Sequence, residues 1–263
     1  MSAHPSTAHP LVRKLSSIFD LTEDEKAAVM RLPLQIVHLE ADQDIVREGD
    51  HPSRSCAVLE GFTHTYKTTA EGKRQILAFH LAGDTPDLQS IHLAVMDCSL
   101  GTLTRCKLGY IQHDALRDLC ARHWRIASVL WRTTLIDAAK FREWLTNMGR
   151  RDAYSRMTHL LCEWVVRLRA VGLVEDWTCE LPMTQVELAD AIGTSTVHVN
   201  RVLQELRAAK LISLKGQTLT VLNWERLRDV SGFDPTYLHL RPDQRGDLPH
   251  AAHSASMPDS APR

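Results

Sequence analysis

Apolar residues first recur at helical spacing and then fall into short runs. Leu11, Leu15, Ile18 and Phe19 share one helical face, and residues 22–25 form a cap pattern before a second short helix that Pro33 ends. From residue 34 to 111, apolar runs alternate with turns that contain Gly and Asp. This pattern predicts an antiparallel roll or barrel. The expected strands are 36–39, 56–59, 62–69, 76–79 and 101–108.

Residues 113–148 contain no Pro or Gly and carry an apolar stripe, which predicts one long helix. The stripe is longer than one small domain needs, so we expect it to pack against a second copy of itself. Gly149 is expected to break this helix and act as a hinge before another helix that Gly172 stops. The last part, 241–263, is rich in Pro, Asp, Ser and Ala and predicts disorder.

These elements predict an α+β chain in four parts. Residues 1–112 would form N-terminal helices and a β-roll, and 113–149 a dimerisation helix. Residues 150–232 would form the next domain, and 233–263 a largely disordered tail.

The balance of charge is neutral for the whole chain and basic in one segment. The net charge is −1, but residues 195–228 hold six basic and two acidic side chains, a local net charge of +4. The six cysteines fit no zinc spacing, which favours reduced thiols in a cytoplasmic protein. No apolar run of about 18 residues predicts a membrane span.

Residues 183–222 have the spacing of a winged helix-turn-helix. Thr184 and Glu187 form a capping box, Gly193 falls where the turn needs a positive φ, and Ser195 can cap a second helix that runs to about 209. Val199 and Val202 would pack back on the first helix. A strand at 211–214, a turn at 215–217 and a strand at 218–222 would form the wing. The combination predicts DNA binding.

The exposed half of the second helix predicts the readout. Arg201 can donate two hydrogen bonds to guanine, and Asn200 can read adenine or bind phosphate. Free N–H groups at the helix start can hold a phosphate. For His198, packing or proximity to phosphate is an equal alternative. The predicted DNA-binding residues are Thr184, Gln185, Ser195, Thr196, Val197, His198, Asn200 and Arg201.

Over about residues 10–230 the chain resembles the Crp/Fnr family of bacterial transcription regulators. Residues 181–207, LPMTQVELADAIGTSTVHVNRVLQELR, are similar to that family's recognition unit almost throughout. The resemblance implies a β-roll sensor, a homodimer on a two-fold symmetric operator, and for activators a contact with RNA polymerase. Relatives with the best-known operators have Glu where this chain has Val197. Val offers only apolar contact, for example to a thymine methyl, so we expect a different base at that step.

The sensor also departs from the family. Cyclic-nucleotide-binding members use a Gly-Glu pair and, about ten residues later, an Arg for the phosphate. This chain has no Arg between Arg74 and Arg105, so usual cyclic AMP binding is not expected. The effector stays unknown and no cofactor is predicted. The pocket residues predicted by alignment are Phe79, Gly83, Asp84, Asp87, Leu88 and Cys98.

Other sensing chemistries and other protein classes remain as alternatives. Haem on His38, His64, His80 or His92, or redox sensing by Cys98 or Cys106, would each use residues of the roll. An N-terminal iron–sulfur cluster does not fit, since no Cys precedes Cys56. A sensor that controls something other than DNA would lack the wing, and we find no catalytic motif that predicts an enzyme.

Overall fold

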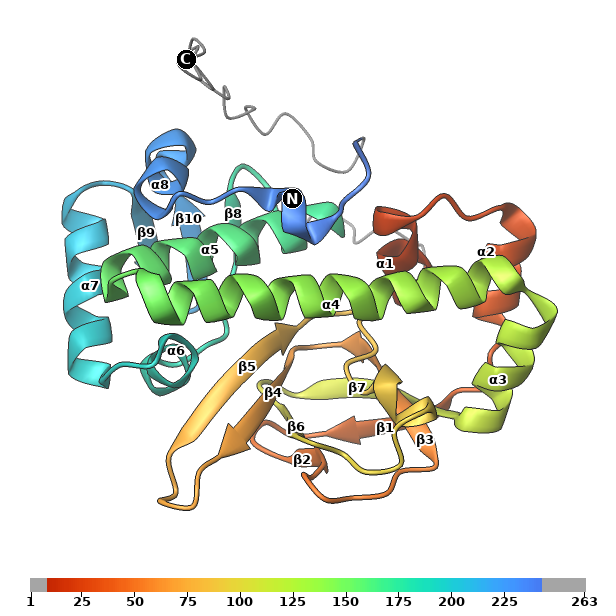
Figure 1. The fold of residues 1–263 in the computed structure, drawn as a ribbon. Coiled ribbons are helices and arrows are strands. Elements are labelled where there is room, and N and C mark those ends of the chain that lie inside the picture. The colour runs from red at the N-terminus through yellow and green to blue at the C-terminus, as the bar shows by residue number, and fades with distance from the viewer. Residues whose placement is uncertain (1–8, 243–263) are drawn as a thin grey trace, which may run out of the picture.

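The computed structural model describes residues 9–242 and has three parts along one long helix (Figure 1). Two helices, α1 (Pro10–Ile18) and α2 (Glu23–Met30), precede the strands. Thr22 and Glu25 form the predicted capping box at the start of α2. Leu11, Leu15 and Ile18 are buried, so the face predicted for α1 packs on the core.

The roll is built from two antiparallel sheets with orders β1-β7-β3 and β2-β6-β4-β5. Cys56, Val58, Leu100 and Leu108 fill the space between them. The prediction of a single strand at 101–108 is wrong, because residues 103–105 carry the chain from one sheet to the other. The strands are β1 (Gln35–Leu39), β2 (Asp44–Val46), β3 (Arg54–Glu60), β4 (Thr63–Thr68), β5 (Arg74–His80), β6 (Ser99–Thr102) and β7 (Cys106–Gln112).

The helix predicted at 113–148 is two helices, α3 (His113–Arg122) and α4 (Trp124–Arg150). The break lies at His123, whose φ of −133° and ψ of 82° are not helical. No Pro or Gly causes it, so the cause is packing. Leu116 and Leu119 of α3 are buried at the end of the roll, and the chain must turn before Ile126 and Val129 of α4 can be buried too.

The helix break predicted at Gly149 lies two residues further along the chain. Helix α4 continues through Gly149 to Arg150, because Gly is tolerated in a helix at a modest cost. The break falls at Arg151 and Asp152, and the Asp152 carboxylate accepts a hydrogen bond from the Ser155 N–H at the start of α5 (Ala153–Ala170). Gly172, with φ of +71°, follows the end of α5 as predicted.

The C-terminal part surrounds α5 with a small sheet, in the order β8-β10-β9, and three helices. The ordered chain extends beyond the boundary predicted at 233, since Phe233, Leu238 and Leu240 are buried. The rest of the predicted tail, 243–263, lies outside the described residues. The elements are β8 (Thr178–Glu180), α6 (Gln185–Ile192), α7 (Thr196–Ala208), β9 (Ile212–Lys215), β10 (Thr218–Val221), α8 (Trp224–Ser231) and the 3₁₀ turn η2 (Pro235–Leu238).

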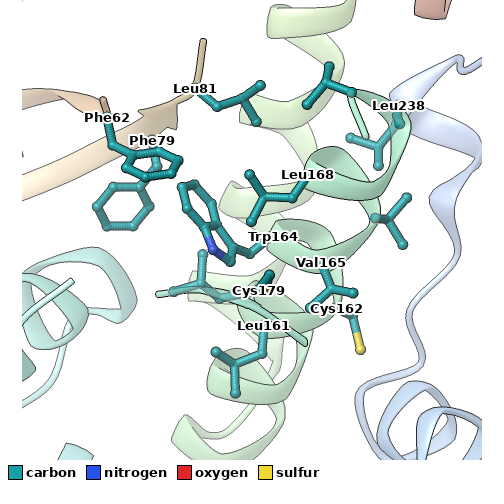
Figure 2. Packing of buried hydrophobic residues seen from close by; sticks show 14 of the residues in the cluster. Phe62, Phe79, Leu81, Leu161, Cys162, Trp164, Val165, Leu168, Cys179 and Leu238 are labelled. Atoms are coloured by element: carbon teal, nitrogen blue, oxygen red, sulfur yellow. The ribbon is translucent and has the colours of Figure 1, made fainter. Parts of the chain in front are cut away.

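The largest side chain of the core joins the roll to the C-terminal part. Trp164 of α5 is 1% exposed, and its ring lies 5.2 Å from that of Phe62 and 6.2 Å from that of Phe79 (Figure 2). Its indole N–H donates to the Glu180 carbonyl. The roll and the first helix of the C-terminal part therefore share one hydrophobic core.

Candidate nucleic-acid interface and sensor cavity

The sequence of residues 184–195 fixes the geometry of the helix-turn-helix. The Thr184 hydroxyl accepts from the Glu187 N–H while the Glu187 carboxylate accepts from the Thr184 N–H, which completes the predicted capping box. Gly193 ends α6 in the left-handed region, with φ of +63°. The Ser195 hydroxyl then accepts from the His198 N–H and starts α7. These local predictions are confirmed.

Helix α7 has one buried and one exposed face. Val199, Val202 and Leu203 are 2% exposed or less and pack in the core, as predicted. Val197, in contrast, is 80% exposed, the highest value among the large apolar side chains of the described residues. A fully exposed valine gains nothing from the fold. Its position at the outer edge of the helix start suits a contact with another molecule.

The polar residues of α7 are held by neighbours. The Arg201 Nε lies 3.3 Å from a Glu205 carboxylate oxygen, and the Arg201 side chain is 69% exposed. The Asn200 side-chain amide donates to Gln185 of α6 and accepts from Gln204. Arg201 is thus presented to solvent, whereas both polar atoms of Asn200 are engaged within the protein. Four other predicted DNA-binding residues are exposed, namely Thr184, Gln185, Ser195 and Thr196, and His198 is partly exposed.

The C-terminal part contacts the sensor through β5 and α4. The Arg74 guanidinium lies 2.8 Å from a carboxylate oxygen of Asp190, and the Gln75 amide donates to the Ala191 carbonyl at the end of α6. Met148 of α4 lies directly against Gly193 in the turn. The helix-turn-helix therefore sits at the C-terminal end of α4.

The structure separates the six residues predicted for the effector pocket. A cavity of about 240 Å³ lies between the roll and α4, and only Leu88 and Cys98 of the six line it. Phe79 packs on Trp144 and Trp164. The other three are Gly83, which lies against α1, Asp84, which forms ion pairs, and Asp87, which accepts a hydrogen bond from the Cys56 N–H.

Asp84 is the centre of a buried ionic network. Its carboxylate lies 2.8 Å from the Lys14 ammonium of α1 and 3.1 Å from the Arg167 guanidinium of α5. These cations outweigh burial and hold the pKa of Asp84 well below its usual range. Arg167 also donates to the Phe79 carbonyl and lies 3.3 Å from Glu163. The turn that the alignment assigned to a ligand is therefore used to join three elements.

The cations at the cavity are engaged. Lys140 lies 2.7 Å from Asp137, and Arg167 bonds to Asp84 and Glu163 as above. The opposite wall carries Asp97, which is an acidic residue and not a cation, and His80, whose Nε2 pairs with the Thr65 hydroxyl. Burial lowers the pKa of His80 to about 3, so this ring is neutral at pH 7. The cavity therefore offers a phosphate no unpaired cation among the described residues.

Four of the six side chains named as alternative sensors, Cys98, Cys106, His64 and His80, are buried, whereas His38 and His92 are exposed. Burial and the neighbouring Asp97 raise the pKa of Cys98 to about 12, and burial raises the pKa of Cys106. Both changes disfavour the reactive thiolate. Burial lowers the pKa of His64 to about 4. Within residues 9–242, no three His, Cys, Asp or Glu side chains are grouped to hold a metal ion.

Asp87 predicts a measurable pH dependence. Burial raises its pKa to about 7, so the folded state holds this proton more tightly than the unfolded state, whose pKa is near 4. The contribution of protonated Asp87 is complete below pH 4 and is lost as the pH rises to about 7. Asp87→Asn should remove this slope, which is at most about 1.4 kcal/mol per pH unit. Urea unfolding at pH 5, 6 and 7.5 measures it; equal slopes for both proteins would contradict the prediction.

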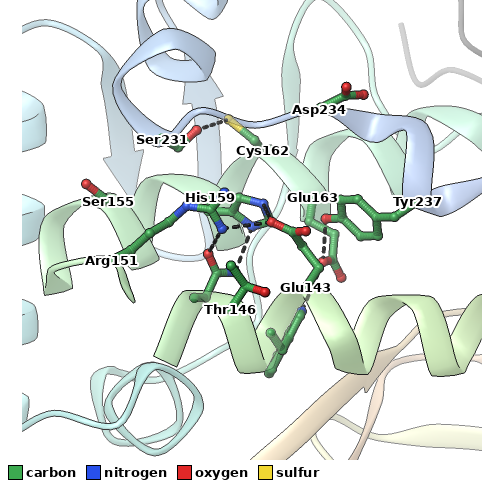
Figure 3. A network of polar contacts seen from close by, with 12 residues as sticks. Glu143, Thr146, Arg151, Ser155, His159, Cys162, Glu163, Ser231, Asp234 and Tyr237 are labelled. Carbon is green, nitrogen blue, oxygen red and sulfur yellow. Dashed lines mark hydrogen bonds and ion pairs between the residues drawn. The ribbon is translucent and has the colours of Figure 1, made fainter. Parts of the chain in front are cut away.

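The junction of α4 and α5 is closed by polar contacts (Figure 3). Arg151 lies 2.8 Å from Glu143 and also bonds to Asn147, and the Asn147 side chain bonds to the His159 ring. One turn further along the same face of α5, Glu163 accepts from the Trp144 indole and the Tyr237 hydroxyl. A rotation between α4 and α5 would have to exchange these contacts.

Sequence reasoning missed the residues that connect the parts. The predicted sites do not include Lys14, Glu163 or Arg167, although each is a charged residue within an apolar helical face. Glu163 and Arg167 are also spaced i, i+4, which favours an ion pair. That pattern indicates a buried pair, but the partner in the roll, Asp84, cannot be found from local spacing.

Comparison with known proteins agrees with both halves of the chain. The family model of the cyclic nucleotide-binding domain matches residues 36–123, and that of the Crp-like helix-turn-helix domain matches 155–230. The fumarate and nitrate reduction regulatory protein of Vibrio cholerae is 23% identical over 84% of this chain and 88% of its own. The nitrogen fixation regulation protein FixK of Bradyrhizobium diazoefficiens is 26% identical over 74% and 81%.

Solved structures show the same fold. FixK2 from Bradyrhizobium japonicum superposes with a TM-score of 0.70 at 22% identity, over 76% of this chain and 98% of its own. The c-di-GMP responsive regulator CLP of Xanthomonas campestris gives 0.62 at 17% identity, over 77% and 100%. No helix of the described residues is long and apolar enough to cross a membrane. The roll, the long helix and the winged helix-turn-helix, together with these matches, place the chain in the Crp/Fnr family of DNA-binding transcription regulators.

Proposed function

We propose that the protein is a cytoplasmic homodimer that binds a two-fold symmetric operator. The observation that carries the proposal is helix α7, which buries Val199 and Val202 and leaves Val197 and Arg201 exposed at its N-terminal half. That half enters the major groove in helix-turn-helix proteins. Thr184, Ser195 and Thr196 lie beside it and suit contacts with phosphate.

The surface of α4 supports the homodimer. Large apolar side chains project from this helix into solvent at heptad-like spacing, which is costly for a monomer. They are Trp124, Trp131, Leu135, Phe141, Leu145 and Met148, all at least 37% exposed. A second copy of α4 would cover them and set two α7 helices about 34 Å apart, one turn of DNA.

The cavity between the roll and α4 is the proposed effector site. Its walls come from the roll at Leu88 and Cys98 and from α4 at Ala138 and Phe141, so a ligand there would alter how the roll packs on α4. Because its cations are paired, we infer that usual cyclic AMP binding does not occur. A change at α4 would reach α7 through the Glu143–Arg151 junction and shift the population of DNA-competent dimers. Contact with RNA polymerase is the expected output of an activator.

Selection of bound DNA from a random pool tests the operator proposal. The wild type should enrich a two-fold symmetric site with guanine at the step read by Arg201 and thymine at the step below Val197. Val197→Glu should change that second base toward cytosine, because a carboxylate accepts from the cytosine amino group.

Gln217→Glu in the turn of the wing is the matched control, because it changes the charge by the same −1 at an exposed position: it should weaken binding to all sequences without changing the preferred base. The assignment of Val197 as a reader is contradicted by an unchanged consensus for Val197→Glu. No enrichment of any site by the wild type would contradict the operator proposal itself.

A further inference from the structure

A groove beside α4 is open in the single chain. It has a volume of about 460 Å³ and is lined mainly by apolar side chains from three elements: η1 (Leu88–Ile91) and the loop after it, α3, and α4. Leu116 and Cys120 form one wall and Leu130 and Trp131 the other, with Leu93 in the loop after η1. Leu93 is 56% exposed and Trp131 is 68% exposed, so water meets a continuous apolar surface here.

The size of the α4 surface indicates that the groove is needed for a dimer. Helix α4 has 27 residues and is therefore about 40 Å long. At a helix width of about 10 Å, its exposed stripe amounts to about 400 Å², half of the roughly 800 Å² per partner of a standard interface. The groove is continuous with this stripe through Trp131, which belongs to both.

The position of the helix-turn-helix decides the orientation of the second copy. Gly193 lies against Met148, so the DNA-binding part sits at the C-terminal end of α4 (Figure 1). Two copies can contact one stretch of DNA only if these ends lie together, so the two α4 helices run parallel. In a parallel two-fold pair, equal residue numbers lie at equal height. The groove takes Ala127 to Thr134 from α4, and the middle of that span is Trp131.

We propose that the groove is the socket for Trp131 of a second copy of this chain, which inserts its indole between α3 and η1 while its own groove receives the same residue in return. The inference rests on the proposed homodimer and adds the contact that completes its interface. A buried indole removes about 150–250 Å² of surface from water, so Trp131 would supply part of the interface area that the α4 stripe lacks. Trp124, one heptad before Trp131, does not line the groove, and in the dimer it would pack on the helix pair instead.

Cys120 provides a reporter that already lies in the groove. It is partly exposed, whereas the other five cysteines, Cys56, Cys98, Cys106, Cys162 and Cys179, are buried. A maleimide should therefore label Cys120 first, with the labelled peptide identified by mass spectrometry. Leu145→Glu places a charge on the α4 stripe 14 residues from Trp131, about 21 Å along the helix, and should give a monomer whose groove is intact.

The expected result is that Cys120 of the wild-type dimer reacts at least about tenfold more slowly than Cys120 of the Leu145→Glu monomer. Trp131→Ala should weaken the dimer, because it removes part of the interface, and it should lose the protection at concentrations where light scattering still finds a dimer. The matched variant Trp124→Ala should keep the protection. Protection is the ratio of the Cys120 labelling rates of monomer and dimer that carry the same residue at position 131. Truncation of Trp131 opens the wall of its own groove, so the double variant Trp131→Ala with Leu145→Glu supplies the monomer rate for Trp131→Ala. If Leu145→Glu does not fold, dilution of the wild type below its dimerisation constant supplies the monomer.

Two results separate the proposals. A wild-type dimer whose Cys120 reacts as fast as that of the monomer, or a Trp131→Ala dimer that stays fully protected, overturns the socket and leaves the homodimer standing. A wild type that is monomeric at every concentration, by light scattering, overturns the homodimer and the socket together.

Discussion

An Arg201→Ala variant is expected to lose specific operator binding while it stays folded. Arg201 is largely exposed, and its ion pair within the described residues is with Glu205, so its removal costs the fold little. In the proposed complex it donates two hydrogen bonds to guanine, worth about 1–3 kcal/mol in each half-site. A dimer loses both, about 2–6 kcal/mol, so affinity should fall by about 30-fold to 10⁴-fold.

Arg207→Ala is the matched control for this experiment. Arg207 lies on the same helix, is also exposed, and carries the same charge, but it belongs to the last turn. Its loss should weaken binding to specific and random DNA alike and lower the salt dependence. Titrations with selected and scrambled operators at two salt concentrations separate the effects. Near wild-type preference for the operator in Arg201→Ala would refute the role of Arg201 as a reader.

An Arg167→Ala variant should be among the least stable single substitutions in the chain. Arg167 is 4% exposed and bonds to Asp84, Glu163 and the Phe79 carbonyl. Truncation leaves two carboxylates buried with fewer partners, a situation that costs about 3–5 kcal/mol. That is a large share of the 5–15 kcal/mol typical of a folded domain. Urea unfolding followed by tryptophan fluorescence measures the loss.

Arg169→Ala gives the comparison for the same truncation on the same helix. Arg169 is partly exposed and lies over the Trp177 ring, so its loss should cost about 1 kcal/mol or less. The buried pair also gives a pH signature. Because the cations hold the pKa of Asp84 low, the stability they provide is lost at acid pH, and wild type and Arg167→Ala should converge there. Equal stability of Arg167→Ala and Arg169→Ala at pH 7 would contradict the proposed role of the network.

The sequence was sufficient wherever local rules govern the structure. The capping box at Thr184, the left-handed Gly193 and the Ser195 cap each act within a few residues, and each was predicted. The break at His123 was not predictable in this way, because residues 113–148 favour one helix and only the need to bury Leu116 and Ile126 in different directions divides it.

The sensor shows the same limit at the level of function. Alignment placed Asp84 in a ligand pocket because of its position after Gly83, which is a local criterion. Its partners Lys14 and Arg167 lie 70 residues before it and 83 residues after it, and no spacing rule connects them. The lack of a phosphate-binding arginine, in contrast, can be predicted from the sequence, because the prediction needs only the absence of Arg between Arg74 and Arg105.

The shared core around Trp164 means that this chain is not modular. A fragment that begins at α5 would expose an indole that Phe62 and Phe79 of the roll now cover, and Arg167 would lose its contacts with Asp84 and the Phe79 carbonyl. Exchange of the DNA-binding part with that of a relative would succeed only if the incoming helix matched the roll at these positions. The two halves must therefore change together in evolution, and an engineered chimera has to carry α5 with its sensor rather than with its recognition helix.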